Sequence, residues 1–304
     1  MEMQNQPLVS VAVITYNSSA TVADTLASVY QQTYKNLELI ISDDGSKDNT
    51  IEVCREWIEG HKDRFKRTEI ITVPQNTGVT VNYQRAFEKC RGEWIKEIDG
   101  DDMLLPECIE EYVSYVTKHP ETSYLFGKVE VFGDNEEVIK RFEDVIFDYS
   151  FFYLSQDEQY RWLTTHPNQP IPSVTSFYNR ERIIKKNIIY DTRIPMLEDW
   201  PRWIQLVEKG IRLDFLDKVI ARYRVSGSES ICSGDVYSKS FKRSLALLYI
   251  YYQYKPSIIY KGRILATLKY VRSKYVATES YIWHIFDFLL RKASRVIRKQ
   301  DAFY

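Results

Sequence analysis

The chain has 304 residues, of which 44% are hydrophobic and 27% charged, as in a globular protein large enough for one α/β domain with an appendage. Its formal net charge of −1 gives no general attraction for polyanions, so we expect no nucleic-acid partner. The four cysteines include no Cys-x-x-Cys pair and there are only four histidines, which argues against a zinc site or a disulfide framework and favours a reducing compartment.

Strands and helices alternate along the first part of the chain. The apolar, β-branched run from Leu8 to Thr15 predicts a buried strand, and further strands are expected over 37–42, 68–73, 93–99 and 124–132. Such alternation indicates βαβ units and a mostly parallel sheet flanked by helices. The helices are indicated by apolar residues at helical spacing, namely Val22, Leu26 and Val29; Ile51, Cys54 and Ile58; Val79, Tyr83 and Phe87; and Ile109, Tyr112 and Val116.

Polar residues follow three of these strands. They are Thr15-Tyr16-Asn17, Asp43-Asp44 and Asp99-Gly100-Asp101-Asp102. Ligands of open α/β sheets bind outside the carboxyl ends of the strands, so these groups predict a site at that edge. No Gly-x-Gly-x-x-Gly follows the first strand and no Gly-x-x-x-x-Gly-Lys-Ser/Thr occurs, which disfavours a dinucleotide-binding fold and a P-loop enzyme.

The third group suggests a cation site. Asp99 and Asp101 are two residues apart at the end of a strand, so their side chains should point the same way and repel one another. Mg²⁺ or Mn²⁺ relieves that repulsion, because these ions take carboxylate oxygens together with substrate phosphates and water. The alternative is a solvated acidic turn between a strand and the helix that starts near Pro106.

The second half of the chain gives two further expectations. Pro167, Pro170 and Pro172 interrupt helical patterns and predict a loop that covers or borders the cleft of the ligand site expected at the edge of the sheet. Asp199 precedes an apolar helical pattern with Pro201 in its first turn, which is typical of a helix N-cap. Asp199 is therefore either a capping residue alone or a general base whose charge the helix N-terminus favours.

The last part of the chain is helical in pattern and basic. Residues 255–304 hold eleven Lys or Arg against three acidic residues, and the apolar residues of 282–290 lie beside several of these cations. Such a face either docks on the rest of the protein or lies on an anionic membrane surface. No signal peptide is recognisable, so we expect a cytoplasmic protein. If the extension lies on a membrane, we expect the protein to be peripheral at the inner face of the plasma membrane.

Taken together, these motifs resemble glycosyltransferase family 2, whose members have the GT-A fold. The similarity covers about residues 7 to 225 and rests on five segments in order: Val9 to Asn17, similar to the family's opening strand; Asp43 to Thr50, similar to DDGSxDxT; Asn76-Thr77-Gly78 with Arg85, similar to NxG…R; Gly92 to Asp102, similar to GEYI…DxDD; and Glu198-Asp199-Trp200, similar to the ED motif. Each segment is weak alone, but the ordered set is specific.

The resemblance implies an architecture and residue roles. It implies a GT-A nucleotide-diphospho-sugar transferase domain over 1–230, with a nucleotide-binding half (1–105) and an acceptor half (106–230), and a helical basic extension over 231–304. Asp101 would bind Mn²⁺ or Mg²⁺, and Asp199 would be the catalytic base. The nucleotide site would contain Thr15, Tyr16, Asn17, Asp43, Asp44, Asn76, Arg85 and Asp99, with Asp43 receiving the base and Asp99 on the ribose side.

The implied reaction is metal-dependent transfer of a sugar, with inversion, from a nucleotide-diphosphate donor such as a UDP-sugar to a saccharide or lipid-linked hydroxyl in surface polysaccharide synthesis. Two alternatives are a nucleotidyltransferase and a non-catalytic nucleotide-sugar-binding relative. The first would need a Gly-rich, Arg-containing loop after the first strand, and the sequence there is Thr15-Tyr16-Asn17-Ser18. A non-catalytic nucleotide-sugar-binding relative would need no base at Asp199, so retention of Asp199 argues against this alternative.

Two departures from the family pattern concern the diphosphate side of the site. Gln205 stands where family members often have an Arg after the ED motif, and residues 223–228 lack the His often found there. Arg222 or Arg224 could supply the positive charge instead, or each could be an ordinary surface residue.

Overall fold

A computed structural model describes residues 6–143, 149–165 and 171–225, together with residues 244, 247, 248, 251 and 252. The chain divides into two compact units, residues 1–192 with 198–233 and residues 193–197 with 234–304. In the second unit, the Arg193 guanidinium lies 4.2 Å from the centre of the Tyr251 ring, and the Met196 N–H donates to Ser244 Oγ at 3.1 Å. These contacts join residues 193–197 to the C-terminal part of the chain.

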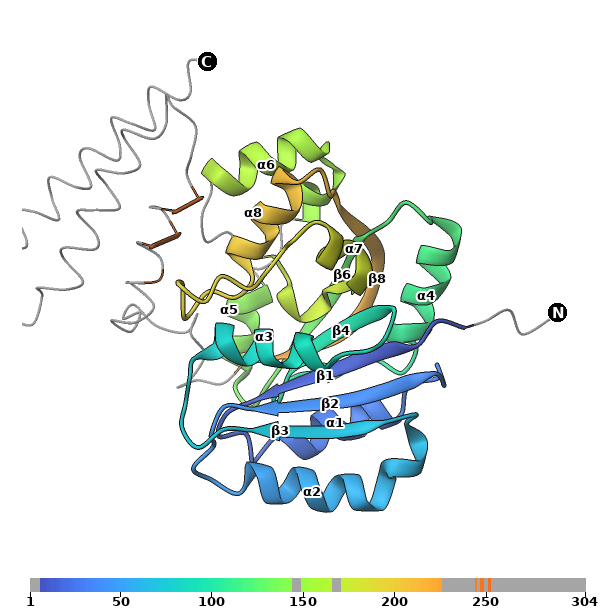
Figure 1. Cartoon of the computed structure of the whole chain (residues 1–304), viewed down its shortest axis with the longest axis vertical. Helices are drawn as coiled ribbons and strands as arrows, with labels where there is room; N and C mark the ends of the chain where they lie inside the picture. Colours follow the sequence, from blue (N-terminus) through green and yellow to red (C-terminus); the bar gives the residue numbers. More distant parts are fainter. Residues whose placement is uncertain are drawn as a thin grey trace, which may run out of the picture. The chain divides into compact units, whose positions relative to one another are not determined.

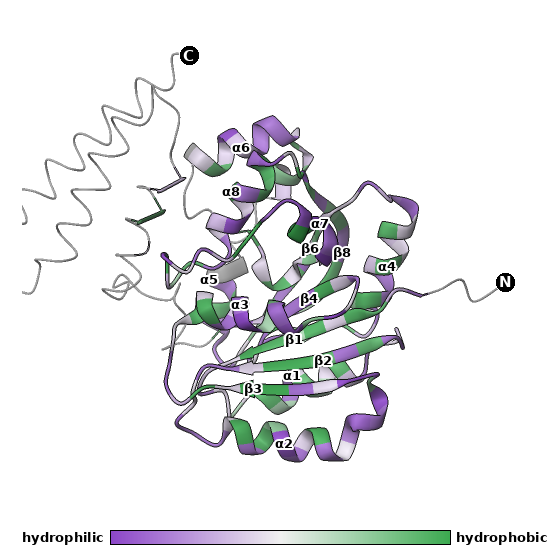
Figure 2. Ribbon diagram, in the orientation of Figure 1, coloured by the Kyte–Doolittle hydropathy of each residue, from purple (hydrophilic) through white to green (hydrophobic). Residues whose placement is uncertain are grey.

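The first half of the sheet is parallel. Strands β1 (Val9–Thr15), β2 (Leu37–Asp43), β3 (Thr68–Thr72) and β4 (Trp94–Asp99) lie side by side in the order β3-β2-β1-β4 (Figure 1). Every residue of β1 and β2 is buried, which explains why these strands are nearly continuous apolar runs rather than alternating ones. Figure 2 shows the same concentration of apolar residues along both strands.

Helices cover both faces of this half. The bounds are α1 (Val22–Tyr30), α2 (Thr50–His61), η1 (Lys62–Arg64), α3 (Val79–Lys89) and α4 (Cys108–Lys118). The apolar sides of α1, α2 and α4 share one core with the residues of β1 and β2 that point to that face. In Figure 1, α3 lies apart from α1 and α2, across the other face of the strands. The predicted βαβ pattern is confirmed.

The second half of the sheet is mixed. Continuing from β4, the order is β7 (Phe177–Asn179), β6 (Tyr124–Phe132), β8 (Leu213–Arg224) and β5 (Met103–Leu104). The short strand β7 runs antiparallel to both β4 and β6, whereas β6 and β8 are parallel. The surrounding segments are α5 (Glu136–Glu143), η2 (Tyr149–Tyr153), α6 (Gln156–Thr165), η3 (Ser173–Thr175), α7 (Arg180–Lys185) and α8 (Trp200–Glu208).

The proline-rich segment is more regular than its sequence suggests. Pro172 directly precedes the short helix η3, and β7 and α7 follow within a few residues. These elements are too short to leave a periodic pattern, which is why only a loop was expected there. Pro167 and Pro170 lie outside the described residues, as does nearly all of the extension predicted over 231–304. Among the helices that the structure describes, none has the length and apolarity needed to cross a bilayer.

Candidate active site

The site lies where the strand order reverses. β1 is paired with β2 on one side and with β4 on the other, so the ends of β1 and β4 flank a topological switch point, the usual ligand site of such sheets. The Gly100 N–H donates to the Ile14 carbonyl at 2.8 Å. A Cβ on Gly100 would come within 2.9 Å of Thr15 Cγ2. A glycine at position 100 therefore allows the acidic loop to approach β1 closely.

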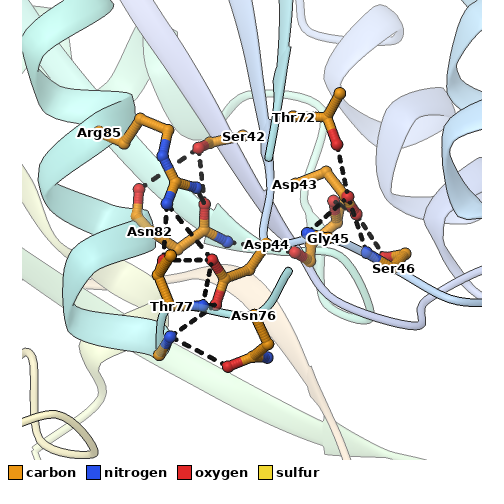
Figure 3. A network of polar contacts seen from close by, with 12 residues as sticks. Ser42, Asp43, Asp44, Gly45, Ser46, Thr72, Asn76, Thr77, Asn82 and Arg85 are labelled. Atoms are coloured by element: carbon orange, nitrogen blue, oxygen red, sulfur yellow. Dashed lines mark hydrogen bonds and ion pairs between the residues drawn. The ribbon is translucent and has the colours of Figure 1, made fainter. Parts of the chain in front are cut away.

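Asp43 ends β2 and is fully buried. Its Oδ1 accepts hydrogen bonds from the Gly45 and Ser46 amides, each at 3.0 Å, and from the Thr72 hydroxyl at 3.1 Å (Figure 3). Its Oδ2 accepts from the hydroxyls of Thr15, at 3.1 Å, and Ser46. The predicted base-binding carboxylate thus also fixes the loop after β2 and ties it to β1 and β3.

Asp44 organises the loop that leads into α3. Its carboxylate accepts from the Thr77 amide, at 3.1 and 3.0 Å, and from the Gly78 amide at 2.8 Å. Arg85 completes the cluster in Figure 3: its guanidinium donates to Asp44 at 3.3 Å, to the Thr77 hydroxyl at 2.6 Å and to Asn82 Oδ1 at 3.0 Å. The structure therefore brings Asp44 and Arg85 together as a partly buried ion pair that holds residues 76–78.

The remaining predicted nucleotide residues lie in the loops around these carboxylates. Tyr16 is 45% exposed, and Asn17 has a φ of 52°, in the left-handed region that asparagine tolerates. Asn17 Oδ1 accepts from the Lys47 amide at 2.8 Å, which joins the loops after β1 and β2. Asn76 Oδ1 accepts from the Gly78 amide at 3.0 Å. Thr15, Asp43 and Asp99 share the carboxyl edge of the sheet with these loops.

The carboxylates of the acidic loop after β4 differ in their exposure and in their partners. Asp99 is half-buried; its desolvation, reinforced by the charge of Asp101, raises its pKa to about 7. Asp101 is exposed, yet the chain around its carboxyl group partly desolvates it and raises its pKa. Asp102, by contrast, is buried and accepts from the Arg224 amide at 2.8 Å. Neighbouring carboxylates whose pKa values are raised fit Mn²⁺ or Mg²⁺ better than a neutral ligand.

The described residues contain no group of three or more His, Cys, Asp or Glu that could enclose a metal ion. A site with one or two carboxylates is what Mg²⁺ and Mn²⁺ use when phosphates and water complete the coordination. Asp101 and Asp99 therefore fit an ion that binds together with a nucleotide, and they do not fit a closed structural site.

Arg222 and Arg224 have different surroundings. Arg222 Nε lies 2.5 Å from a carboxylate oxygen of Glu130, on the neighbouring strand β6. Arg224 Nε donates to the carbonyl of Asp101 at 2.7 Å, and its Nη2 donates to Asp24 at 3.0 Å. Of the two, Arg224 lies directly beside the acidic loop, so it is the better source of positive charge there.

Asp199 is the N-cap of α8, as predicted. Its Oδ1 accepts from the Trp200 amide at 2.5 Å, and Pro201 follows in the first turn. Burial raises the pKa of Asp199 to about 6, although the hydrogen bond from Trp200 opposes that shift. For Glu198, burial and the neighbouring charges of Asp199 and Asp99 raise the pKa well above its usual value. With a pKa of about 6, Asp199 is ionised at neutral pH.

The acid pair lines a small pocket that extends to Tyr83, next to the acidic loop. Glu198 and Asp199 line it together with Tyr83 on α3, whose hydroxyl donates to Asp99 Oδ1 at 2.7 Å. The other lining residues are Glu97, Tyr124, Ser173, Ser176, Tyr190, Arg202 and Trp203. Tyr83 thus bridges the two sets of carboxylates that the sequence analysis placed in separate motifs.

Several residues of this pocket were missed from the sequence. Tyr83 was interpreted only as part of the apolar face of α3, and its spacing carries no sign of the contact with Asp99. Arg202 and Glu97 form a buried ion pair at 3.3 Å, although each stands in a segment that predicts a solvated charge equally well. Gln205 exchanges hydrogen bonds with the backbone of Ile189, at 3.2 and 3.1 Å, so this departure from the family pattern holds a loop.

Comparison with known proteins agrees with this architecture. The model of the family described as Glycosyl transferase family 2 matches residues 10–188. The chain is 24% identical over 287 residues to an uncharacterized glycosyltransferase of Methanocaldococcus jannaschii, covering 94% of this chain and 87% of the relative. It is 25% identical over 243 residues to the Escherichia coli UDP-Glc:alpha-D-GlcNAc-diphosphoundecaprenol beta-1,3-glucosyltransferase WfaP, covering 77% and 82%.

Solved structures show the same fold. S. aureus TarS 1–349 in complex with UDP-GlcNAc superposes with a TM-score of 0.61 at 17% identity, over 90% of this chain and 74% of that one. The mannosyltransferase PcManGT from Pyrobaculum calidifontis, in complex with GDP-Man and Mn²⁺, gives 0.57 at 15% identity, over 98% and 81%. Since the family model covers more than half of the chain, the protein belongs to glycosyltransferase family 2 and is a glycosyltransferase with the GT-A fold.

Proposed function

We propose that this glycosyltransferase is metal-dependent and inverting, and that it transfers a sugar from a UDP-sugar to a saccharide or lipid-linked hydroxyl during surface polysaccharide synthesis. One observation carries this proposal. Tyr83 lines a pocket together with the acid pair at the start of α8 and donates to Asp99 of the acidic loop after β4, so the proposed base and the proposed cation site lie on either side of one tyrosine.

Asp101, with Asp99, would hold Mn²⁺ or Mg²⁺. A divalent cation there supplies Lewis-acid neutralisation of the charge that develops on the departing nucleoside diphosphate. Arg224, which contacts the Asp101 carbonyl, adds positive charge to the same side of the site. In this proposal, the positive charge of Arg224 replaces that of the His missing from residues 223–228 and of the Arg that family members often have at the position of Gln205.

Asp199 is the general base. It takes the proton of the acceptor hydroxyl while the acceptor oxygen attacks the anomeric carbon of the donor and the bond to the diphosphate breaks. With one base and no enzyme nucleophile, the attack comes from the face opposite the leaving group and the configuration inverts. Asp199 suits this function better than Glu198 because a pKa of about 6 leaves it ionised at neutral pH, whereas burial and neighbouring charges raise the pKa of Glu198 well above its usual value.

The nucleotide would lie on the loops after β1, β2 and β3. Tyr16, Asn17 and Asn76 lie on these loops, Thr15, Asp43 and Asp99 lie at the ends of the strands next to them, and Asp44 with Arg85 keeps residues 76–78 in place. The name of WfaP and the TarS complex favour uridine as the nucleoside and a lipid-linked saccharide as one acceptor class. Such an acceptor lies at a membrane, which agrees with the basic C-terminal extension expected to contact anionic lipids.

The two alternatives weighed from the sequence fit less well. A nucleotidyltransferase would need a Gly-rich, Arg-containing loop after β1, and that loop contains Tyr16 and Asn17 instead. A nucleotide-sugar-binding relative without turnover would need no ionised carboxylate at the start of α8.

The test is release of UDP from UDP-glucose and UDP-GlcNAc, with Mn²⁺ and with EDTA. Asp199→Asn should retain UDP binding but lose roughly 10²- to 10⁴-fold in turnover, the usual contribution of a general base. Near-wild-type turnover in this variant would refute the assignment of the base. Full turnover in EDTA would refute metal dependence.

A further inference from the structure

A buried ion pair adjoins the acid pair of α8. Arg202 is 2% exposed and Glu97 is 3% exposed, and Arg202 Nη1 lies 3.3 Å from Glu97 Oε2. Glu97 stands on β4 two residues before Asp99, and Arg202 stands in the first turn of α8, three residues after Asp199. The pair therefore joins the strand that ends in the acidic loop to the helix that begins with the proposed base.

The contacts of Arg202 use its shape as well as its charge. Its guanidinium carbon lies 4.2 Å from the centre of the Tyr178 ring and 4.1 Å from that of Tyr190. Both tyrosines also donate to Glu97 Oε1, Tyr178 at 2.6 Å. A planar guanidinium can pack on aromatic faces while its N–H groups bind a carboxylate, which a lysine ammonium cannot reproduce.

Stability alone does not explain this cluster. Burying an ion pair contributes little net stability compared with apolar packing, and Nε of Arg202 lacks a hydrogen-bond partner within the described part of the chain. The neighbouring cation does not replace Arg202: Lys96 donates to the carbonyls of Val174, at 2.6 Å, and Glu97, and burial lowers its pKa. Arg202 is thus the cation that faces the carboxylate of Glu97.

We propose that Arg202 is a positioning residue for the acid pair. By pairing with Glu97 and packing on Tyr178 and Tyr190, it fixes the first turn of α8 and with it the direction of the Asp199 carboxylate in the pocket. This inference rests on the proposed function, which makes Asp199 the base. A displacement of about 1 Å can cost on the order of 10²-fold in rate, so a rigid anchor one turn away has a catalytic consequence.

The main test compares Arg202→Lys with a matched control, Arg67→Lys, in the full-length protein. Arg67 also pairs with a buried glutamate, Glu38, at 3.0 Å, but at the opposite end of the sheet. Hydrogen–deuterium exchange with saturating UDP and Mn²⁺ would follow peptides covering 198–208. We expect faster exchange in these peptides for Arg202→Lys and unchanged exchange there for Arg67→Lys.

The kinetic readout is UDP release from UDP-glucose or UDP-GlcNAc. Arg202→Lys should lower kcat by about 10- to 100-fold while KM for the donor changes less than about twofold. If the lysine variant does not fold, the double variant Glu97→Gln/Arg202→Met removes both charges, leaves no buried unpaired ion, and should show the same local exchange.

Four results decide whether the positioning inference and the proposed base stand or fail. Wild-type exchange over 198–208 in Arg202→Lys would overturn the proposal, and so would faster exchange spread evenly over all peptides. If Asp199→Asn keeps full turnover, the proposed base fails, but the exchange data still show whether Arg202 fixes α8. If Asp199→Asn is inactive and Arg202→Lys keeps wild-type kcat, the positioning inference alone fails.

Discussion

The two acidic pairs at the edge of the sheet, Asp43–Asp44 after β2 and Glu198–Asp199 before α8, differ in how the chain uses their charge. Asp43 and Asp44 accept hydrogen bonds from backbone amides, from hydroxyls and from Arg85. Among the described residues, the only other residue that donates to the second pair is Trp200. Burial raises the pKa of both Glu198 and Asp199, and for Glu198 the charges of Asp199 and Asp99 add to the shift.

This difference separates two kinds of functional residue. The first pair stabilises the loops that would carry the nucleotide, so its charge is already compensated within the folded chain. The second pair is held where its charge is unfavourable, which proteins tolerate chiefly at sites where a reaction uses it. Both pairs belong to sequence motifs that resemble those of glycosyltransferase family 2. Only their hydrogen bonds in the structure distinguish the two pairs.

The sharpest test of the comparison is Asp44→Asn. The amide cannot accept all of the hydrogen bonds from Thr77 and Gly78, and it leaves the guanidinium of Arg85 without its carboxylate. We expect a loss of about 3 kcal/mol in the free energy of unfolding. Urea unfolding would measure it, and a loss under about 1 kcal/mol would show that the cluster in Figure 3 does not stabilise the fold.

The second test is the pH dependence of turnover. The pKa of Asp199 is raised to about 6, and a general base acts only when ionised, so kcat should fall about tenfold per unit as the pH drops below about 6. A pH profile of UDP release, with protein stability checked at each pH, gives this acid limb. A rate that stays flat down to pH ~4.5 would mean that a group with an ordinary carboxyl pKa acts as the base.

The smallest effect is expected for Glu198→Gln, the isosteric counterpart of Asp44→Asn. Because burial and the charges of Asp199 and Asp99 raise the pKa of Glu198 well above its usual value, its negative charge is unfavourable in the folded protein, and a neutral amide of the same shape removes that charge. The free energy of unfolding should change by less than about 0.5 kcal/mol. A loss as large as that of Asp44→Asn would contradict the distinction between the two pairs.

Much of the fold follows from local sequence patterns. The β-branched runs of β1 and β2 predict buried parallel strands, and the acidic residues after β2 and β4 predict the edge where the site lies. Asp199 also takes the predicted N-cap position, because Pro201 and the apolar pattern of α8 leave few other starting points.

The rest depends on contacts between distant segments. Tyr83 looks like a core residue of α3, and only the packing of α3 across the sheet directs its hydroxyl to Asp99. Arg202 and Glu97 are 105 positions apart, and no local pattern distinguishes their buried pair from two solvated charges. Strand β7 has three residues, too few for a periodic signal, so the mixed half of the sheet could not be foreseen.

The most direct measurement is a calorimetric titration of the protein with UDP, with and without Mn²⁺, repeated with Asp101→Asn. If the carboxylates after β4 are held for a cation and a nucleotide, Mn²⁺ should strengthen UDP binding markedly in the wild type and not in the variant. Equal affinity with and without Mn²⁺ in the wild type, or the same Mn²⁺ effect in Asp101→Asn, would contradict this account of the site.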